Sequence, residues 1–177
     1  MPDDAQADLV SDALAGDEAA FTALVGPLLA HGYQLAIAIL RDPQEAQDAL
    51  QDASFTAWRQ LRQLRDGSSF RSWFLRIVVN KCKVVRRSRW WSVVRVGDTD
   101  LIKQEAKDDS IRDLDLHRAI RRLRSDDRIA IFLYFYLDLP LDEVAQVLGL
   151  SGAAARSRLY RAVRKLRPGL QGQEVFQ

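Results

Sequence analysis

The sequence predicts an all-α fold of two small helical domains joined by a linker, with a helix-turn-helix as the C-terminal domain. Helix breakers are few, with 5 prolines and 9 glycines in 177 residues, and apolar residues recur at helical spacing. Charge is segregated: residues 1–60 carry 2 basic and 10 acidic side chains, residues 61–95 carry 10 and 1, residues 96–115 carry 3 and 7, and residues 151–177 carry 6 and 1. Two basic blocks separated by an acidic segment predict two contacts with a polyanion.

Composition narrows the class of protein. A hydrophobic content of 47% with 28% charged residues is typical of a soluble globular protein. The single Cys82 excludes an internal disulfide and a cysteine-rich zinc site, and it fits a reducing cytoplasm. The longest apolar stretch, 129–137, is too short to span a bilayer, and no N-terminal apolar run follows a basic start. We therefore expect a soluble cytoplasmic protein without membrane insertion.

The first 40 residues predict two helices. Gly16-Asp17-Glu18 is typical of a helix start, because acidic side chains suit an N-terminus. Gly26-Pro27 is expected to interrupt this helix, since proline lacks the backbone donor and clashes with the preceding turn. A second, largely apolar helix is expected from about 28 to 40. His31 within it is interpreted as structural, because the sequence offers no neighbouring metal ligands.

The next helix is predicted to begin at Asp42-Pro43, with proline in its first position. Its inward stripe consists of small and apolar residues: Ala46, Leu50, Ala53, Ala57 and Leu61. Glu45, Asp48 and Asp52 lie partly outside this stripe, at steps of three and four. Such an acidic ridge either docks a basic protein surface or is simply a solvated face.

Residues 65–69 form a loop by composition, and Ser68 or Ser69 is expected to cap the helix that follows to Arg89. We expect this helix to bury four residues: Phe70, Trp73, Ile77 and Val84. Its polar stripe has steps of four, three and four: Arg76, Asn80, Lys83 and Arg87. Positive charge beside an amide suits single-stranded or opened DNA. Trp73 and Phe74 are interpreted as core rather than as stacking platforms, and Cys82 as a packed residue rather than a nucleophile.

Residues 90–115 lose helical periodicity, and we place an acidic linker at 93–113, between domains at 1–92 and 114–177. After it, Leu116, Ile120 and Leu123 share one helical face. Ser125-Asp126-Asp127 is expected to cap a buried helix over 129–137. The polar tail after Gly169 is expected to fray.

Residues 139–167 are typical of a helix-turn-helix. Pro140 presets the start of the first helix, Gly149 closes it, and Ser151 caps the second. The second helix has one apolar face: Ala155, Leu159, Ala162 and Leu166. Its other faces are basic, so its N-terminal part can enter a major groove. The competing interpretation is an ordinary helical hairpin with a solvated basic face.

Four segments together resemble one family. GDEAAFTALV (16–25) is similar to the start of region 2 of bacterial sigma-70 factors, and DPQEAQDALQDASFTAWRQL (42–61) resembles the family's D-x-x-[DE]-A-E-D-x-x-Q-[DE]-x-F-x-x-x-W pattern. SFRSWFLRIVVNKCKVVRR (69–87) resembles its S-F-R-x-W-L-x-R-I-x-x-N motif, and residues 141–167 resemble region 4. The set, in this order, identifies the chain as a member of the extracytoplasmic-function (ECF) group.

The resemblance implies a promoter-specificity subunit of RNA polymerase with three contact surfaces. Residues expected to dock the clamp helices of core polymerase are Glu45, Asp48, Gln51 and Asp52. Residues expected to open and read the −10 element are Ser68, Ser69, Phe70, Arg71, Arg76, Asn80, Lys83 and Arg87. Residues expected to read the −35 element are Arg156, Ser157, Arg158, Tyr160, Arg161, Arg164 and Lys165.

The family also implies contact with the polymerase flap through the helices before the helix-turn-helix, and an anti-sigma partner. An alternative is a stand-alone helix-turn-helix regulator, which leaves the acidic N-terminal block and the 76–87 stripe without a role. An enzyme is not expected, nor a metal or cofactor, because the sequence has no metal-ligand spacing and no phosphate-binding glycine loop.

Overall fold

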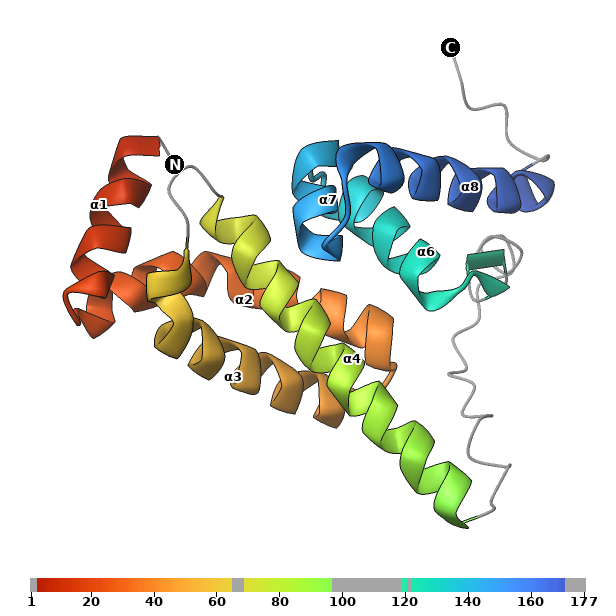
Figure 1. Cartoon of the computed structure of the whole chain (residues 1–177), viewed down its shortest axis with the longest axis horizontal. Coiled ribbons are helices and arrows are strands. Elements are labelled where there is room, and N and C mark those ends of the chain that lie inside the picture. The colour runs from red at the N-terminus through yellow and green to blue at the C-terminus, as the bar shows by residue number, and fades with distance from the viewer. Residues whose placement is uncertain (1–2, 65–68, 97–118, 121, 171–177) are drawn as a thin grey trace. The chain divides into compact units, whose positions relative to one another are not determined.

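The computed structural model describes residues 3–64, 69–96, 119–120 and 122–170. Every regular element in these ranges is helical, which confirms the all-α prediction (Figure 1). The chain divides into two compact units, Met1–Arg95 and Val96–Gln177. Each unit has its own buried apolar side chains and is described by itself.

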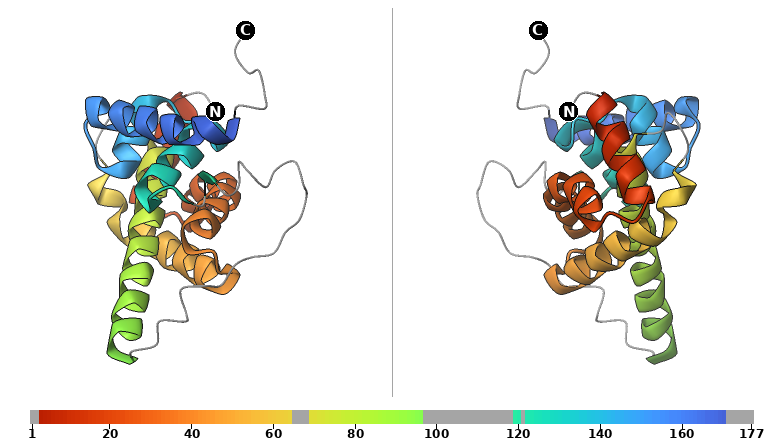
Figure 2. Two further views of the ribbon diagram at one scale, coloured as in Figure 1. Left: turned by 90° about the vertical axis from the view of Figure 1, so that its right-hand side faces the viewer. Right: turned by 90° about the vertical axis from the view of Figure 1, so that its left-hand side faces the viewer.

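The first unit contains α1 (Asp3–Leu14), α2 (Glu18–Leu40), α3 (Pro43–Gln60), a 3-10 turn (Leu61–Gln63) and α4 (Phe70–Val96). The helix α1 was not predicted from the sequence, although Leu9, Val10 and Ala13 follow helical spacing. It packs against α2, and α2 packs against α3. The far part of α4 extends past the start of α3, as two further views show (Figure 2).

The helix α2 runs unbroken through Gly26-Pro27, so the predicted interruption is wrong. A proline inside a helix costs about 3 kcal/mol. Here both residues are exposed, while Leu24 and Leu35 on either side of them are buried. Burial of one continuous apolar face therefore offsets the missing hydrogen bond.

By length and composition alone, α2 also matches a membrane span, with a mean hydropathy of 1.6 over its most apolar 18 residues. This helix contains a longer apolar segment than residues 129–137. The helix packs against α1 and α3 and buries eight residues, which is the behaviour of a core helix.

The helices α2 and α3 start where the sequence predicted, and a polar side chain caps each start. The Asp17 carboxylate accepts hydrogen bonds from the backbone N–H groups of Ala19 (2.8 Å) and Ala20 (3.2 Å). The Asp42 carboxylate accepts one from the N–H of Glu45 (2.8 Å). Between them, Arg41 closes α2 in the left-handed conformation with φ 59°. These caps fix the corner from which α3 departs.

Small residues bring the helices of the first unit close together. Ala46, Ala53 and Ala57 of α3 are fully buried. A Cβ atom added to Gly32 of α2 would lie 2.8 Å from Cδ1 of Leu50 in α3, with Phe74 of α4 at 3.5 Å. The three helices therefore meet at Gly32, which holds α4 in place against the other two.

The helix α4 buries Phe70, Phe74, Leu75, Val78 and Cys82. The core roles predicted for Phe70, Phe74, Ile77 and Cys82 are confirmed, and Trp73 is half-buried. The prediction for Val84 is wrong, because its side chain is 61% exposed. The helix also continues to Val96, beyond the predicted end at Arg89. The remainder of the predicted linker, 97–113, lies outside the described residues.

The second unit contains α6 (Ser125–Ile131), a π-helical turn (Phe132–Tyr136), α7 (Leu141–Leu148) and α8 (Gly152–Leu170). The helix α8 packs against both α6 and α7. Leu123, Ala162 and Leu166 form a buried cluster with Ile120 and Ile131 beside it, as expected for Ile120 and Leu123; Leu116 lies outside the described residues. The predicted side-chain cap before α6 is wrong, because its N-cap is Arg124 and makes no side-chain capping bond.

The predicted buried helix over 129–137 is only half correct. Ile129, Leu133 and Leu137 are buried. The chain widens after Ile131, where the N–H of Leu137 bonds the carbonyl of Phe132 (3.0 Å). This wider turn leaves Phe135 60% and Tyr136 57% exposed. Periodicity alone did not predict the change from α to π geometry.

Candidate nucleic-acid interface

The helix-turn-helix is built as its sequence predicts. Gly149 ends α7 in the left-handed conformation with φ 67°. The Ser151 hydroxyl then accepts a hydrogen bond from the N–H of Ala154 (3.3 Å), which caps α8. Val144 and Val147 of α7 and Ala155 of α8 are buried between the two helices. One face of α8 is thereby fixed inward, and the opposite face is presented outward.

The exposed face of α8 carries most of the residues predicted to read duplex DNA. Six of the seven are exposed, and only Arg158 is half-buried: Arg156, Ser157, Tyr160, Arg161, Arg164 and Lys165. Steps of three and four place Ser157, Tyr160 and Arg164 at the middle of this face. Tyr160 is 68% exposed. Three guanidinium groups around a phenol form a surface suited to phosphates and base edges.

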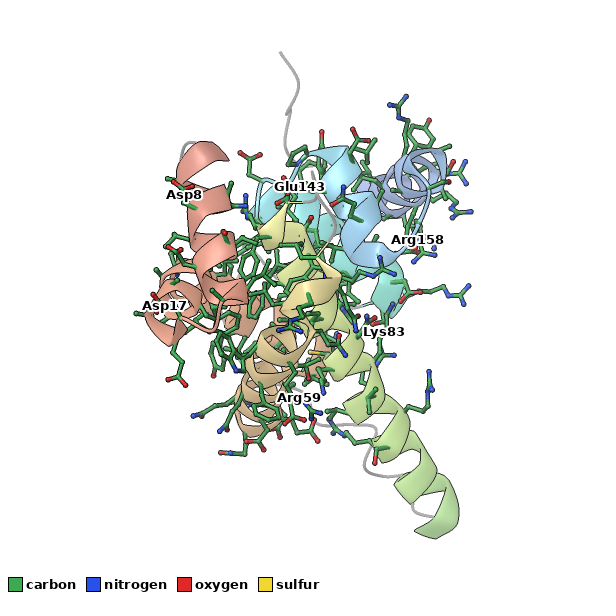
Figure 3. All side chains as sticks on the ribbon, turned by 60° about the vertical axis from the view of Figure 1, so that its left-hand side comes forward. Asp8, Asp17, Arg59, Lys83, Glu143 and Arg158 are labelled. Atoms are coloured by element: carbon green, nitrogen blue, oxygen red, sulfur yellow. The ribbon has the colours of Figure 1, made fainter. Side chains whose placement is uncertain are left out.

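Two of the predicted cations of α8 form ion pairs within the unit. Arg158 (labelled in Figure 3) lies 3.2 Å from the Asp126 carboxylate, and Lys165 lies 2.8 Å from Asp127. Asp127 is buried and belongs, like Asp126, to the first turn of α6. These ion pairs fix α8 on α6, so Arg158 and Lys165 flank the exposed face instead of forming it. Sequence spacing could not reveal this, because the partners lie more than thirty residues away.

A second basic face lies on α4. Arg76, Asn80 and Arg87 are exposed and Lys83 (labelled in Figure 3) is half-buried, so the predicted stripe follows one side of the helix. In the part of the chain that the structure describes, Arg76, Lys83 and Arg87 form no ion pair with another residue. Their charges are therefore available to an external anion.

The remaining residues predicted to contact the −10 element lie at or just before the start of α4, and their exposure differs. Ser69 caps the helix: its hydroxyl accepts a 3.4 Å hydrogen bond from the N–H of Ser72, whereas Ser68 lies outside the described residues. Arg71 is half-buried. Phe70 is 2% exposed, and its ring stacks on that of Phe74 with 6.4 Å between the ring centroids. Phe70 thus supports the helix from inside and offers no surface to DNA in this structure.

The acidic ridge on α3 is largely solvent-facing. Asp48, Gln51 and Asp52 are exposed. Glu45 differs, because its carboxylate pairs with Arg89 of α4 at 2.9 Å. Phe55 was not predicted as part of this ridge, yet the residue is 62% exposed on the same side of α3. Its position three residues after Asp52 was the available signal.

Cys82 and His31 are residue types that can act as a nucleophile or a metal ligand, but in this structure both are packed within helices. Cys82 is fully buried, and burial raises the pKa of its thiol to about 12, against smaller lowering effects from a backbone hydrogen bond and Arg86. His31 is half-buried in α2. Within the described ranges, no group of three His, Cys, Asp or Glu side chains is arranged to hold a metal ion.

Sequence comparison matches both helical parts to one family. The family described as "Sigma-70 region 2" matches residues 24–92, and "Sigma-70, region 4" matches residues 113–166. RNA polymerase sigma-H factor of Pseudomonas aeruginosa is 30% identical, over 92% of this chain and 92% of its own. CnrH of Cupriavidus metallidurans is 30% identical, over 93% and 94%. The chain belongs to the sigma-70 family of RNA polymerase sigma factors, in the ECF group.

Solved structures agree with this sigma factor in fold. CnrH in complex with the cytosolic domain of CnrY has a TM-score of 0.71 and 25% identity, over 96% of this chain and 99% of that one. The sigma factor RpoE in complex with the anti-sigma factor NepR from Bartonella quintana has a TM-score of 0.68 and 25% identity, over 85% and 96%. The chain is thus a promoter-specificity subunit, and a stand-alone helix-turn-helix regulator is not favoured.

Proposed function

We propose that this sigma factor uses three separate surfaces for polymerase, the −10 element and the −35 element. The exposed carboxylates Asp48 and Asp52 of α3, with Gln51, dock core polymerase. The basic stripe of α4 opens and holds the −10 element. The exposed face of α8 reads the −35 element as duplex. One observation carries this proposal: the structure has two exposed basic helix faces and one exposed acidic helix face. The opposite face of each of these helices is buried in the core of its unit, which fixes the orientation of the helix.

Charge and geometry assign each surface its partner. A phosphate backbone is repelled by the α3 carboxylates, so that helix suits a basic protein surface. Asn80 lies between cations of α4 and can bond to a base edge while the cations hold phosphates. The α8 face is convex and projects from a helix-turn-helix, which suits a major groove. The domain bounds 1–92, 93–113 and 114–177 belong to the same proposal.

The contribution of the individual predicted residues follows from their exposure. Arg156, Arg161 and Arg164 make the main electrostatic contribution at the −35 element. Arg158 and Lys165 reach phosphates only at the edge of the contact, because Asp126 and Asp127 neutralise them. Glu45 serves mainly to hold Arg89 and α4. Ser69 orients the start of α4, and Phe70 supports it from the core.

The protein acts in the cytoplasm, without catalysis of its own and without a cofactor, through binding and DNA melting. The turn before α7 docks the polymerase flap through its exposed aromatic side chains. Regulation is by an anti-sigma factor that covers the DNA-binding faces. The similar sigma factor RpoE was solved in complex with an anti-sigma factor, NepR.

The test separates the polymerase surface from the DNA surfaces. Asp48→Ala is expected to weaken binding to core polymerase and to leave binding of α8 to duplex DNA unchanged. Arg156→Ala is expected to do the reverse. Fluorescence anisotropy with labelled protein and core polymerase, and with a labelled promoter duplex, measures both affinities. Equal losses of both affinities in either variant would contradict the division into surfaces.

A further inference from the structure

The exposed face of α3 contains an aromatic side chain among its carboxylates. Phe55 is 62% exposed. Asp48, Gln51 and Asp52 lie three to seven residues before it in the same helix, so all four side chains share one side of α3. The guanidinium of Arg59 (labelled in Figure 3) lies 5.7 Å from the centre of the Phe55 ring.

The unit itself does not require Phe55 for its core. The inward positions of α3 are occupied by alanines. The preceding Ser54 is half-buried, and its hydroxyl donates a 3.0 Å hydrogen bond to the carbonyl of Leu50. One residue further along a helix is a rotation of about 100°, which carries Phe55 from this inward side to the solvent. An exposed cation–π contact contributes only about 0.5–1 kcal/mol.

We infer that Phe55 is the apolar anchor of the polymerase-docking surface, with Arg59 holding its ring in place. This inference rests on the proposed function of α3. The expected occupant is a basic protein surface of core polymerase that offers an apolar pocket. A central aromatic side chain with charged residues around it is the usual composition of an interface hot spot.

Charge complementarity selects this occupant. Asp48 and Asp52 beside the ring repel nucleic acid and anionic membranes. They attract a basic protein surface. When such a partner covers α3, the contacts that surround the Phe55 ring exclude water from it. The Arg59 guanidinium already lies 5.7 Å from the ring centre without a partner, so its position requires less rearrangement on association.

The experiment compares two side chains of nearly equal exposure in the same unit. Phe55→Ala removes the anchor, and Val84→Ala truncates a 61% exposed side chain of α4 as the matched control. We expect Phe55→Ala to weaken binding to core polymerase at least about 30-fold, the scale of a hot-spot residue. Val84→Ala should change that affinity less than about 2-fold. Full-length protein and purified core polymerase, without DNA, are the probes.

Three further measurements make the outcome specific. Thermal unfolding of Phe55→Ala should match the parent protein, because the ring is outside the core. Phe55→Leu should recover part of the affinity, since an apolar side chain remains. Arg59→Ala should give a smaller loss than Phe55→Ala.

The inference and the proposed function fail in different ways. Loss of affinity in Asp48→Ala with none in Phe55→Ala overturns the anchor and leaves the docking surface in place. No loss in either variant overturns both. An equal loss in Val84→Ala also overturns the anchor, because the effect would then not be specific to α3.

Discussion

The two basic helices of this sigma factor present their charge in different ways. On α4, Arg76, Lys83 and Arg87 form no ion pair with another described residue. On α8, Arg158 and Lys165 are paired with α6, while Arg156, Arg161 and Arg164 are exposed. Cations on α8 therefore divide into some that hold the helix and some that face outward. The difference teaches that a basic residue in a DNA-binding helix is not automatically a DNA contact.

The largest effect is expected from the α4 stripe. The double variant Arg76→Ala/Lys83→Ala should reduce promoter opening about 100-fold, if each lost charged contact costs about 1.5 kcal/mol. The salt slope of binding to opened DNA should fall by about 1.4, since each single-strand phosphate contact contributes about 0.7. Permanganate reactivity of promoter thymines with the holoenzyme measures opening.

The α4 prediction has an internal control. Val84→Ala lies beside Lys83 and removes no charge, so the salt slope should not change. If the double variant opens promoters as well as the parent protein, the α4 stripe does not act on DNA.

A smaller effect is expected on α8, where single variants should separate the two kinds of cation. Arg156→Ala should weaken duplex binding about 10-fold and reduce the salt slope by about 0.9, with no change in Tm. Arg158→Ala should lower Tm, because it breaks the pair with Asp126, and it should change the salt slope less. If both variants reduce the salt slope of duplex binding equally, the paired and the exposed cations of α8 do not differ in their contact with DNA.

Next in size is the stability of the second unit. Asp127→Ala should destabilise it by about 1 kcal/mol, since the partner Lys165 is half exposed and its charge is partly screened. A double-mutant cycle with Lys165→Ala, followed by urea unfolding, measures the coupling. Additive losses would show that the 2.8 Å contact contributes nothing to the position of α8.

The smallest effect on function is expected at Cys82, which contacts neither DNA nor polymerase. Burial raises the pKa of its thiol to about 12. The thiol remains neutral in the folded protein, so its contribution to stability is complete below pH 9 and is lost as pH rises from 9 toward 12. At pH 8, iodoacetamide should label Cys82 only after unfolding in urea. Mass spectrometry measures the adduct, and rapid labelling of the native protein would refute the buried position.

Local features of the fold were predictable from the sequence. The helix starts predicted at Asp17 and Asp42 and the cap predicted at Ser151 depend on hydrogen bonds within three residues, and the structure has all three. Gly149 likewise ends its helix locally. The exposed stripe of α4 followed from helical spacing alone.

Features that depend on distant residues were not predictable. Val84 has an apolar side chain at a helical position, but whether another segment covers it depends on tertiary packing, and in the structure it is exposed. The pairing of Glu45 with Arg89 joins residues 44 apart in the sequence. Pro27 was expected to break a helix because its local cost is known, whereas the burial that offsets this cost comes from α1 and α3.

The most direct test of the central claim is start-site mapping on genomic fragments with core polymerase, with and without this protein. We predict starts that appear only when the protein is present and share two upstream sequence elements. The Arg76→Ala/Lys83→Ala variant should lose all of these starts, while Arg156→Ala should lose most strongly those that depend on the upstream element. Absence of any protein-dependent start on every fragment would contradict the claim.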